Sequence, residues 1–222
     1  MNYKTQVIIY NTNNAMLLCR RNRADGKWSL IGGALEGEEE AKICAVRKLR
    51  EQTGLDITLD RLTLCDIAYG AHDDPDRIVT ITFKTSVDEP FTLRPTDPEI
   101  SEVVWKTNVS NVDWSSDEEK KAVANYFEKK KQEEVLAQLH YASFRNEEWV
   151  KRSGLCGCFY CLKTFAPADI VLWGDDNDQD PRTACCPYCG IDSVLTEYVP
   201  IGHITNMPQV LAAMRDKYFP SH

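Results

Sequence analysis

The 222-residue sequence contains no long hydrophobic run, no internal repeat and no low-complexity segment. No stretch approaches the roughly 18 consecutive apolar residues of a membrane-spanning helix, so we expect no membrane contact. The first residues lead directly into a strand-like segment at 7–10 without the apolar core of a signal peptide, which predicts a cytoplasmic protein. The sequence therefore belongs to the class of ordinary globular chains, and its length allows one or two domains.

The sequence also lacks a basic segment. Its net charge is −8, and residues 153–222 hold four basic and eight acidic side chains. A nucleic-acid footprint needs clustered Lys and Arg, so this balance argues against nucleic acid as a partner. Because an acidic surface repels polyanions, a phosphate-bearing ligand has to be held by local groups or by a metal.

The first 115 residues alternate strand and helix signals. Residues 11–14 form a turn-rich tetrapeptide, which predicts a hairpin between strands at 7–10 and 15–19. A helix is expected from 38 to 52, where apolar residues recur at helical spacing and Gly54 supplies a stop. Further strands are expected at 57–59, 62–68, 77–86 and 102–105. This order predicts an α/β (α+β) sandwich.

A second helix is predicted from residue 115 to about 139, because capping serines precede three acidic residues there. We place the domain limits around this helix. The expected organisation is an N-terminal domain at 1–115, a helical linker at 116–152 and a small domain at 153–222.

A glycine pair and an acidic helix carry the strongest chemical signal. Gly32 and Gly33 permit close backbone approach, and a carbonyl there could join a metal shell. Residues three and four apart share a helix face, so Arg47, Lys48 and Glu51 are neighbours. Mg²⁺ prefers oxygen ligands and usually binds through one or two carboxylates together with substrate phosphates.

The spacing of this segment resembles the signature of the Nudix hydrolases. From Gly33, five residues lead to Glu39 and seven more to Arg47, and Leu49, Glu51, Gly54 and Leu55 follow in the family's order. The likeness covers about residues 3–115 and implies a Nudix-type mixed-sheet sandwich with helices. It also implies a pyrophosphohydrolase that acts with Mg²⁺ (or Mn²⁺) on a nucleoside diphosphate-linked substrate, a nucleotide or nucleotide-sugar-type molecule.

The resemblance extends to individual residues. It implies catalytic roles for Arg47 and Glu51, and magnesium bound by Glu51 and the Gly32 backbone. Gly32 and Gly33 are then the expected phosphate-binding residues, and Lys48 joins them if its ammonium occupies the place of the metal against the phosphates.

The segment departs from the family signature at two positions, where Lys48 and Gln52 replace carboxylates. The formal charge of the site changes by +3, from +2 for Glu to Lys and +1 for Glu to Gln. Three interpretations follow. The first is an active enzyme in which a rearranged metal-ligand shell recruits another carboxylate. The second is a non-catalytic nucleotide-binding sensor or adaptor with Lys48 in the place of the metal, and the third is a purely structural helix. The carboxylates available for a rearranged shell are Glu36, Glu38, Glu39, Glu99 and Glu102.

Other residues leave alternatives open. Arg20, Arg21 and Arg23 follow a strand and either contact phosphates or lie in a solvated loop. Trp28 either stacks on a base or belongs to the core.

Six of the nine cysteines crowd into residues 156–189. Cys158 with Cys161 and Cys186 with Cys189 form two Cys-x-x-Cys pairs with 24 residues between them, including an acidic loop at 175–180. In a chain without a secretion signal this pattern predicts a structural Zn²⁺ site with four thiolate ligands. Cys156 and Cys185 are rival ligands, and a redox-active pair is the alternative chemistry.

Residues 140–219 also resemble a bacterial cytoplasmic zinc-ribbon family. The residues that carry the likeness are the segments 156–161 and 186–194. This resemblance implies a small zinc ribbon but no chemistry of its own, and we expect a protein partner at the ribbon rather than nucleic acid.

Overall fold

A computed structural model describes residues 2–23, 25–70, 77–88, 92–174 and 181–220. The chain folds into two compact units, Met1–Phe127 and Glu128–His222. The division falls inside helix α2 (Asp117–Ala142), within the segment expected to be a linker. The domain limits at 115 and 153 stay predictions, and the acidic loop at 175–180 lies outside the described residues.

The first unit is built on a mixed sheet, as the sequence predicts, which has seven strands among the described residues. The main path runs β3-β2-β1-β6-β5, while β4 pairs with β1 and β7 pairs with β2. β1 and β6 run parallel and the other paired strands are antiparallel. The strands are β1 (Asn2–Asn11), β2 (Met16–Arg21), β3 (Trp28–Ser29), β4 (Ile31–Ala34), β5 (Thr63–Tyr69), β6 (Ile78–Val87) and β7 (Ile100–Lys106).

The hairpin expected around residues 11–14 is confirmed by the antiparallel pairing of Tyr10 with Met16. The side chain of Asn11 holds the turn, because its oxygen accepts hydrogen bonds from the N–H groups of Asn13 at 3.0 Å and Ala15 at 2.9 Å. Such side-chain-to-backbone bonds are the reason that asparagine is frequent in turns.

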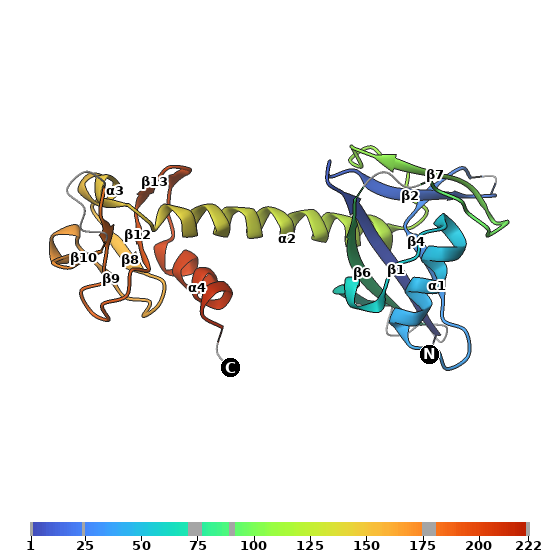
Figure 1. Ribbon diagram of the computed structural model, residues 1–222, viewed down its shortest axis with the longest axis horizontal. Coiled ribbons are helices and arrows are strands. Elements are labelled where there is room, and N and C mark those ends of the chain that lie inside the picture. The colour runs from blue at the N-terminus through green and yellow to red at the C-terminus, as the bar shows by residue number, and fades with distance from the viewer. Residues whose placement is uncertain (1, 24, 71–76, 89–91, 175–180, 221–222) are drawn as a thin grey trace. The chain divides into compact units, whose positions relative to one another are not determined.

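Helix α1 (Ala41–Thr53) covers one face of the sheet, beside β1 and β4 (Figure 1). Its buried Ala45 and Leu49 pack with Val7 and Ile9 of β1. The helix ends where Gly54 adopts the left-handed conformation at φ 77° and donates its N–H to the Arg50 carbonyl at 2.9 Å. The predicted stop is therefore confirmed, and it fixes the position of the last turn of α1.

The first turns of α2 belong to a second core on the sheet. Val123 and Tyr126 pack there with Ile8, Leu18 and Trp28. Trp28 is 8% exposed, which agrees with the core interpretation of this residue. As predicted, Ser116 caps the helix, because its Oγ accepts the Glu119 N–H at 3.2 Å.

One predicted strand is wrong. Residues 55–58 alternate in burial, with Leu55 and Ile57 buried and Asp56 and Thr58 exposed, but Leu59 is exposed and begins the short 3₁₀ helix η1 (Leu59–Arg61). The Arg61 N–H closes this turn on the Thr58 carbonyl at 3.1 Å. The alternation reflects a chain that runs extended over the core before it turns.

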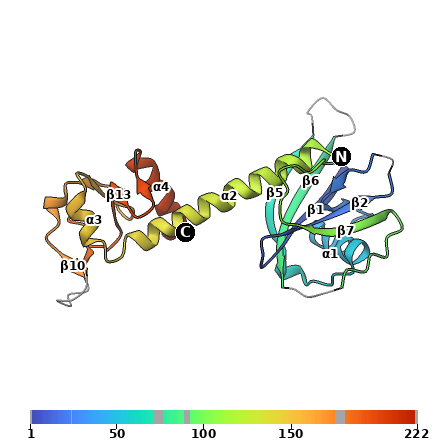
Figure 2. The ribbon, with the colours of Figure 1, turned by 90° about the horizontal axis from the view of Figure 1, so that it is seen from above.

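The second unit contains the later part of α2, a short helix, small sheets and helix α4. In Figures 1 and 2, α4 lies beside the second half of α2. The ring of Tyr218 stacks on His140 at 4.1 Å, and the Tyr218 hydroxyl donates to the Leu136 carbonyl at 3.3 Å. The elements are α3 (Glu147–Arg152), β8 (Cys156–Cys158), β9 (Thr164–Phe165), η2 (Pro167–Asp169), β10 (Trp173–Gly174), β11 (Thr183–Ala184), β12 (Val194–Thr196), β13 (Tyr198–Val199), β14 (Gly202–His203) and α4 (Met207–Tyr218).

Across the part of the chain that the structure describes, no helix has both the length and the apolar character needed to cross a bilayer.

Candidate functional site

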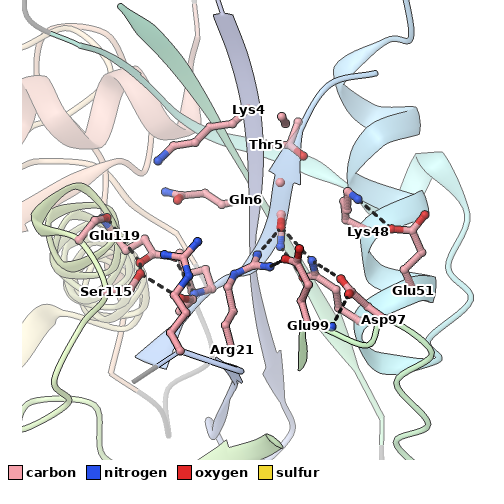
Figure 3. A pocket seen from close by; sticks show the side chains of 18 of the residues that line it. Lys4, Thr5, Gln6, Arg21, Lys48, Glu51, Asp97, Glu99, Ser115 and Glu119 are labelled. Atoms are coloured by element: carbon pink, nitrogen blue, oxygen red, sulfur yellow. Dashed lines mark hydrogen bonds and ion pairs between the residues drawn. The ribbon is translucent and has the colours of Figure 1, made fainter. Parts of the chain in front are cut away.

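A polar cavity of about 850 Å³, here called the inner cavity, opens beside the glycine pair (Figure 3). Of its described lining side chains, only those of Leu30, Ala34 and Pro98 are apolar. The cavity therefore suits a charged ligand that forms hydrogen bonds. Its lining residues are Lys4, Thr5, Gln6, Arg21, Arg23, Ser29, Leu30, Gly32, Gly33, Ala34, Glu36, Lys48, Glu51, Gln52, Thr96, Asp97, Pro98, Glu99, Ser115, Ser116 and Glu119.

Both glycines of the pair lie on β4, and close neighbours explain their small size. A Cβ atom at Gly32 would lie 2.2 Å from the Thr5 carbonyl oxygen on β1. A Cβ atom at Gly33 would lie 3.0 Å from Cε of Lys48. Gly32 thus permits the pairing of β4 with β1, and Gly33 leaves room for the Lys48 side chain to lie across β4.

Lys48 and Glu51 project from the last turns of α1 and form an ion pair at the inner cavity (Figure 3). Lys48 Nζ lies 2.9 Å from Glu51 Oε2, and Arg47 Nη1 lies 3.3 Å from Glu51 Oε1. The hydrogen bond from Lys48 lowers the pKa of Glu51 below its ordinary value, with a further contribution from Arg47. Glu51 is therefore ionised, and each of its oxygens contacts a cation of the protein itself.

Gln52 is buried, and its amide forms a two-point contact with the Gly32 peptide. The Gly32 N–H donates to Gln52 Oε1 at 3.0 Å, and Gln52 Nε2 donates to the Gly32 carbonyl at 3.0 Å. Arg21 Nη2 donates to the same carbonyl at 2.9 Å. A carbonyl oxygen has two lone pairs, so both acceptor positions of Gly32 are used.

These contacts decide whether the residues present fit Mg²⁺. The two ligands expected from the sequence are the Glu51 carboxylate and the Gly32 carbonyl, and both are occupied by donors of the protein. Among the described residues, the sole group of three or more Asp, Glu, His or Cys side chains close enough to share an ion is formed by cysteines elsewhere in the chain. As arranged here, the donor set does not fit magnesium.

Arg47 gathers two of the alternative carboxylates. Its Nη1 lies 2.9 Å from Glu36 Oε1, and its Nη2 lies 2.5 Å from Glu39 Oε1. The hydrogen bond from Arg47 lowers the pKa of Glu39 from 4.5 to about 2. Arg47 therefore holds Glu36, Glu39 and Glu51 at one point beside the inner cavity but does not line that cavity.

Two further carboxylates are paired with arginines of β2. Glu99 lies 3.5 Å from Arg21, and Glu102 lies 3.3 Å from Arg20. Arg21 and Arg23 line the inner cavity, whereas Arg20 stacks over the Trp28 ring at 4.3 Å. Of the three arginines considered from the sequence, two are thus placed where a ligand could meet them.

The end of the inner cavity away from Lys48 is formed by the start of α2 and by β1. Glu119 is buried there; its Oε1 accepts the Leu30 N–H at 2.9 Å and its Oε2 accepts from the Ser115 hydroxyl. Burial raises the pKa of Glu119. Lys4 and Gln6 complete this end (Figure 3).

Sequence reasoning missed Lys4, Gln6, Asp97 and Glu119 as lining residues. The alternation of strand β1 could have placed Lys4 and Gln6 on one face, but it could not show which face meets the glycine pair. In the sequence, Glu119 is only one of the three acidic residues in the first turn of the predicted helix.

Comparison with known proteins identifies the family. The family model described as NUDIX domain matches residues 3–126, more than half of the chain, so this protein belongs to the Nudix family. The match extends into the first turns of α2, beyond the predicted limit at 115. It does not reach the cysteine-rich segment, so the zinc ribbon stays a prediction from the cysteine pattern.

Several known proteins are similar to parts of this chain. An 8-oxo-dGTP diphosphatase of Proteus vulgaris is 37% identical over 79 residues, which are 35% of this chain and 67% of that protein. A MutT/nudix family protein from Enterococcus faecalis has a TM-score of 0.41 at 21% identity, over 47% of this chain and 42% of that one, so less than half of its length is spanned. The NUDIX domain of Shewanella oneidensis NrtR, solved with ADP ribose, has a TM-score of 0.49 at 16% identity, over 57% and 86% of the two chains.

The second unit brings four cysteine sulfurs together. The ligand atoms of Cys158, Cys161, Cys186 and Cys189 all lie within 4.8 Å of one another. The Sγ atoms of Cys158 and Cys189 are 3.7 Å apart, as are those of Cys161 and Cys186. A tetrahedral zinc site with Zn–S bonds of about 2.3 Å has S···S edges of about 3.8 Å. The four sulfurs therefore fit Zn²⁺, and Cys156 and Cys185 lie outside the group.

The two cysteine pairs sit in matching turns. Leu162 N–H donates to the Cys158 carbonyl at 2.8 Å, and Gly190 N–H donates to the Cys186 carbonyl at 2.9 Å. Leu162 and Gly190 both adopt positive φ, 63° and 76°. Left-handed backbone is unusual for leucine, so this turn is held by its surroundings. Backbone N–H groups also point at two sulfurs, from Cys161 to Cys158 at 3.5 Å and from Tyr188 to Cys186 at 3.4 Å.

Proposed function

We propose that the N-terminal unit binds the diphosphate of a nucleotide-type molecule without efficient hydrolysis, as a sensor or adaptor. The observation that carries this proposal is the Lys48 ammonium, which lies beside Gly33 and pairs with Glu51 at 2.9 Å. A cation at this point can contact phosphate oxygens directly, in the place of a metal ion. When a phosphate enters, Glu51 keeps Lys48 oriented toward the inner cavity.

Four basic and five acidic side chains of the described residues line the inner cavity, and three of the acidic ones, Glu36, Glu51 and Glu99, are paired with Arg47, Lys48 and Arg21. The basic groups around the cavity are the support for an anionic ligand. Lys4, Arg21, Arg23 and Lys48 all line it. Lys4 forms no ion pair within 4 Å among the described side chains. Charge-assisted hydrogen bonds to such groups are roughly twice as strong as neutral ones. The polar end formed by Gln6, Ser115 and Glu119 then suits the sugar or base attached to the phosphates.

The proposal is tested by the affinity of ADP in the presence of EDTA, measured by calorimetry. Lys48→Ala should weaken ADP binding at least tenfold, because a hydrogen bond to a charged group contributes about 1.5–3 kcal/mol. Lys120→Ala, at an exposed position of α2, is the matched control and should leave the affinity unchanged. Equal affinities of wild type and Lys48→Ala would contradict the proposal.

A Nudix pyrophosphohydrolase is the second candidate. Family membership supports it, and so does the relative named as an 8-oxo-dGTP diphosphatase. In this candidate Arg47 and Glu51 are catalytic, and water attacks a phosphorus to release a nucleoside monophosphate and the other half of the substrate. Magnesium or manganese at Glu51 and Gly32 stays a prediction, which requires that Lys48 and Gln52 release these groups.

A hydrolysis screen separates the two candidates. It compares nucleoside triphosphates, ADP-ribose, NADH and dinucleoside polyphosphates with Mg²⁺ and with Mn²⁺. Turnover that Glu51→Gln abolishes would establish the enzyme and contradict the sensor. Tight binding without turnover would do the reverse.

For the second unit we propose that Cys158, Cys161, Cys186 and Cys189 bind one structural Zn²⁺ and that the resulting ribbon contacts a protein partner. Support for the metal comes from the sulfur spacing and the matching turns. Elemental analysis of the purified chain should find one zinc per chain. A metal-free chain in which the second unit is folded would contradict the site.

A further inference from the structure

The inner cavity offers no aromatic ring on which a nucleobase could stack. Among its described lining residues there is no Phe, Tyr, Trp or His. Trp28, which the sequence offered as a stacking partner, is 8% exposed and does not line the cavity. Its ring instead contacts the Arg20 guanidinium at 4.3 Å and the Lys106 ammonium at 4.2 Å. Proteins that recognise single bases commonly stack them on aromatic side chains, and the described part of this cavity provides none.

The polar end presents a buried amide with an oxygen directed at the cavity. Gln6 is 4% exposed and lines the cavity from β1 (Figure 3). Its Nε2 donates to Thr82 Oγ1 at 3.0 Å, which fixes the amide in one orientation. No described residue donates to Gln6 Oε1, and this oxygen is not enclosed by the protein. Because a buried acceptor requires a donor, Gln6 is poised to accept a hydrogen bond from a ligand in the cavity.

A chain of hydroxyl groups supplies a second acceptor. The Ser29 hydroxyl donates to Ser115 Oγ at 2.9 Å, and the Ser115 hydroxyl donates to the Glu119 carboxylate. Since the proton of Ser29 is used within this chain, the lone pairs of its oxygen are left for the cavity that it lines. Glu119 has both oxygens occupied and so orients the two serines.

Lys4 supplies a donor beside these acceptors. Lys4 and Gln6 are two residues apart on β1 and therefore lie on one face of the strand, and both side chains point to the same end of the cavity (Figure 3). In the pairing of β1 with β4, Gln6 is the partner of Gly32, at the glycine pair beside the proposed diphosphate site. Antiparallel partners are about 5 Å apart, so the polar end receives the group that is joined directly to the phosphates.

We propose that the polar end of the inner cavity binds the neighbouring hydroxyls of the sugar that carries the diphosphate, and that the base makes no specific contact. This inference rests on the proposed function. A hydroxyl both donates and accepts, so one hydroxyl of a ribose can donate to Gln6 Oε1 and accept from Lys4 Nζ while the next donates to Ser29 Oγ. The preferred class of ligand is therefore a sugar diphosphate, whichever base it carries.

The test is calorimetry in EDTA with four probes. ADP is compared with UDP, with methyl riboside 5-diphosphate, in which a methoxy group replaces the base, and with 2′,3′-dideoxy-ADP. UDP and methyl riboside 5-diphosphate should bind as ADP does. Dideoxy-ADP should bind about tenfold more weakly, because it lacks the donors for Gln6 and Ser29. Much weaker binding of methyl riboside 5-diphosphate, or equal binding of ADP and dideoxy-ADP, would overturn the inference.

Variants locate the effect. Gln6→Met removes the amide and keeps the length of the side chain, so ADP and dideoxy-ADP should then differ far less in affinity. Lys4→Met should also reduce the difference, at a less buried position where the fold is expected to tolerate it. Gln132→Met, at an exposed position of α2, is the matched control and should keep the full difference. An unchanged difference in folded Gln6→Met and Lys4→Met, as verified by melting temperature, would contradict the assignment.

The same titrations separate this inference from the proposed function. If none of the four probes binds, the proposed function fails. If ADP binds and dideoxy-ADP binds equally well, the diphosphate site stands and only the sugar assignment fails.

Discussion

The Nudix unit and the cysteine unit differ in how their candidate metal ligands are used. In the Nudix unit the Glu51 carboxylate contacts Lys48 and Arg47, and the Gly32 carbonyl accepts from Arg21 and Gln52. In the cysteine unit four sulfurs converge on one point, with backbone N–H groups as their further partners. One site has donors of the protein itself where a metal would bind, and the other gathers four sulfurs at a spacing that fits Zn²⁺.

The spacing of a family signature and the chemical groups at its ligand positions can thus vary separately. The spacing of glycines and apolar residues preserves the sandwich and the inner cavity. The two substituted positions, Lys48 and Gln52, instead satisfy the same backbone and carboxylate groups from within the protein.

Zinc removal should have the largest effect. Zinc binding contributes about 10–16 kcal/mol in zinc-finger peptides, so chelation should unfold the cysteine unit and leave the Nudix unit folded. Hydrogen exchange on the full chain measures both units at once: exchange should rise around residues 156–196 and stay low in β1 and α1. Cys158→Ser should resemble chelation, whereas Cys65→Ser, at a thiol outside the group, should not. Unchanged protection in the chelated chain would contradict the zinc site.

Gln52→Ala should have the next largest effect on the stability of the fold. It leaves the buried N–H of Gly32 without its partner and removes one donor to the Gly32 carbonyl, at a cost of about 1–3 kcal/mol per unsatisfied group. We expect the free energy of unfolding to fall by about 2–4 kcal/mol, measured by urea titration of the Nudix transition. Gln132→Ala, at an exposed position of α2, should change it by less than about 0.5 kcal/mol. A small effect at Gln52 would show that the amide contact is dispensable.

The double variant Lys48→Glu and Gln52→Glu should make the site of the Nudix unit a better metal-binding site. It changes the local charge by −3, and unit charges about 4 Å apart interact by about 4 kcal/mol at an effective dielectric of 20. We expect the affinity for Mn²⁺ to rise at least tenfold, as measured by electron paramagnetic resonance of free Mn²⁺. The pair Lys120→Glu and Lys121→Glu controls for nonspecific attraction. No gain over this control would mean that other features exclude the metal.

Acid should weaken the ion pairs that Arg47 forms with carboxylates in the Nudix unit. The pKa of Glu39 is lowered from 4.5 to about 2 by Arg47. A lowered pKa stabilises the fold above the unfolded value, and this contribution is lost as pH falls from 4.5 toward 2. Stability of Glu39→Gln should therefore depend less on pH in this window than that of wild type, as followed by thermal melts. Glu38→Gln, at an exposed position, should keep the wild-type slope.

Local patterns were sufficient to predict much of the fold and part of the candidate site. The spacing from Gly33 to Gly54 predicted α1 and its stop, and it put Lys48 and Glu51 on one helix face. It could not predict the two-point contact of Gln52 with Gly32, because that depends on how β4 and α1 pack. The strand expected at 57–59 failed for a similar reason: apolar residues that alternate with polar ones, as Leu55 and Ile57 do, also occur in extended chain that crosses a core.

The cysteine pattern was informative because spacing alone brings thiols within reach of one metal in a tight turn. Cys156 and Cys185 remained rivals in the sequence, since adjacent cysteines cannot be ranked without the turn geometry. The structure gathers the four sulfurs of the matched pairs, and the zinc ion itself stays a proposal.

The most direct measurement of the central claim, that Lys48 takes the place of a metal, is a calorimetric titration of the full chain with ADP-ribose, once in EDTA and once in Mg²⁺, with the product analysed afterwards. We predict equal affinities within about twofold, intact ADP-ribose in both samples, and loss of binding in Lys48→Ala. Binding that requires Mg²⁺, together with release of AMP, would contradict the account.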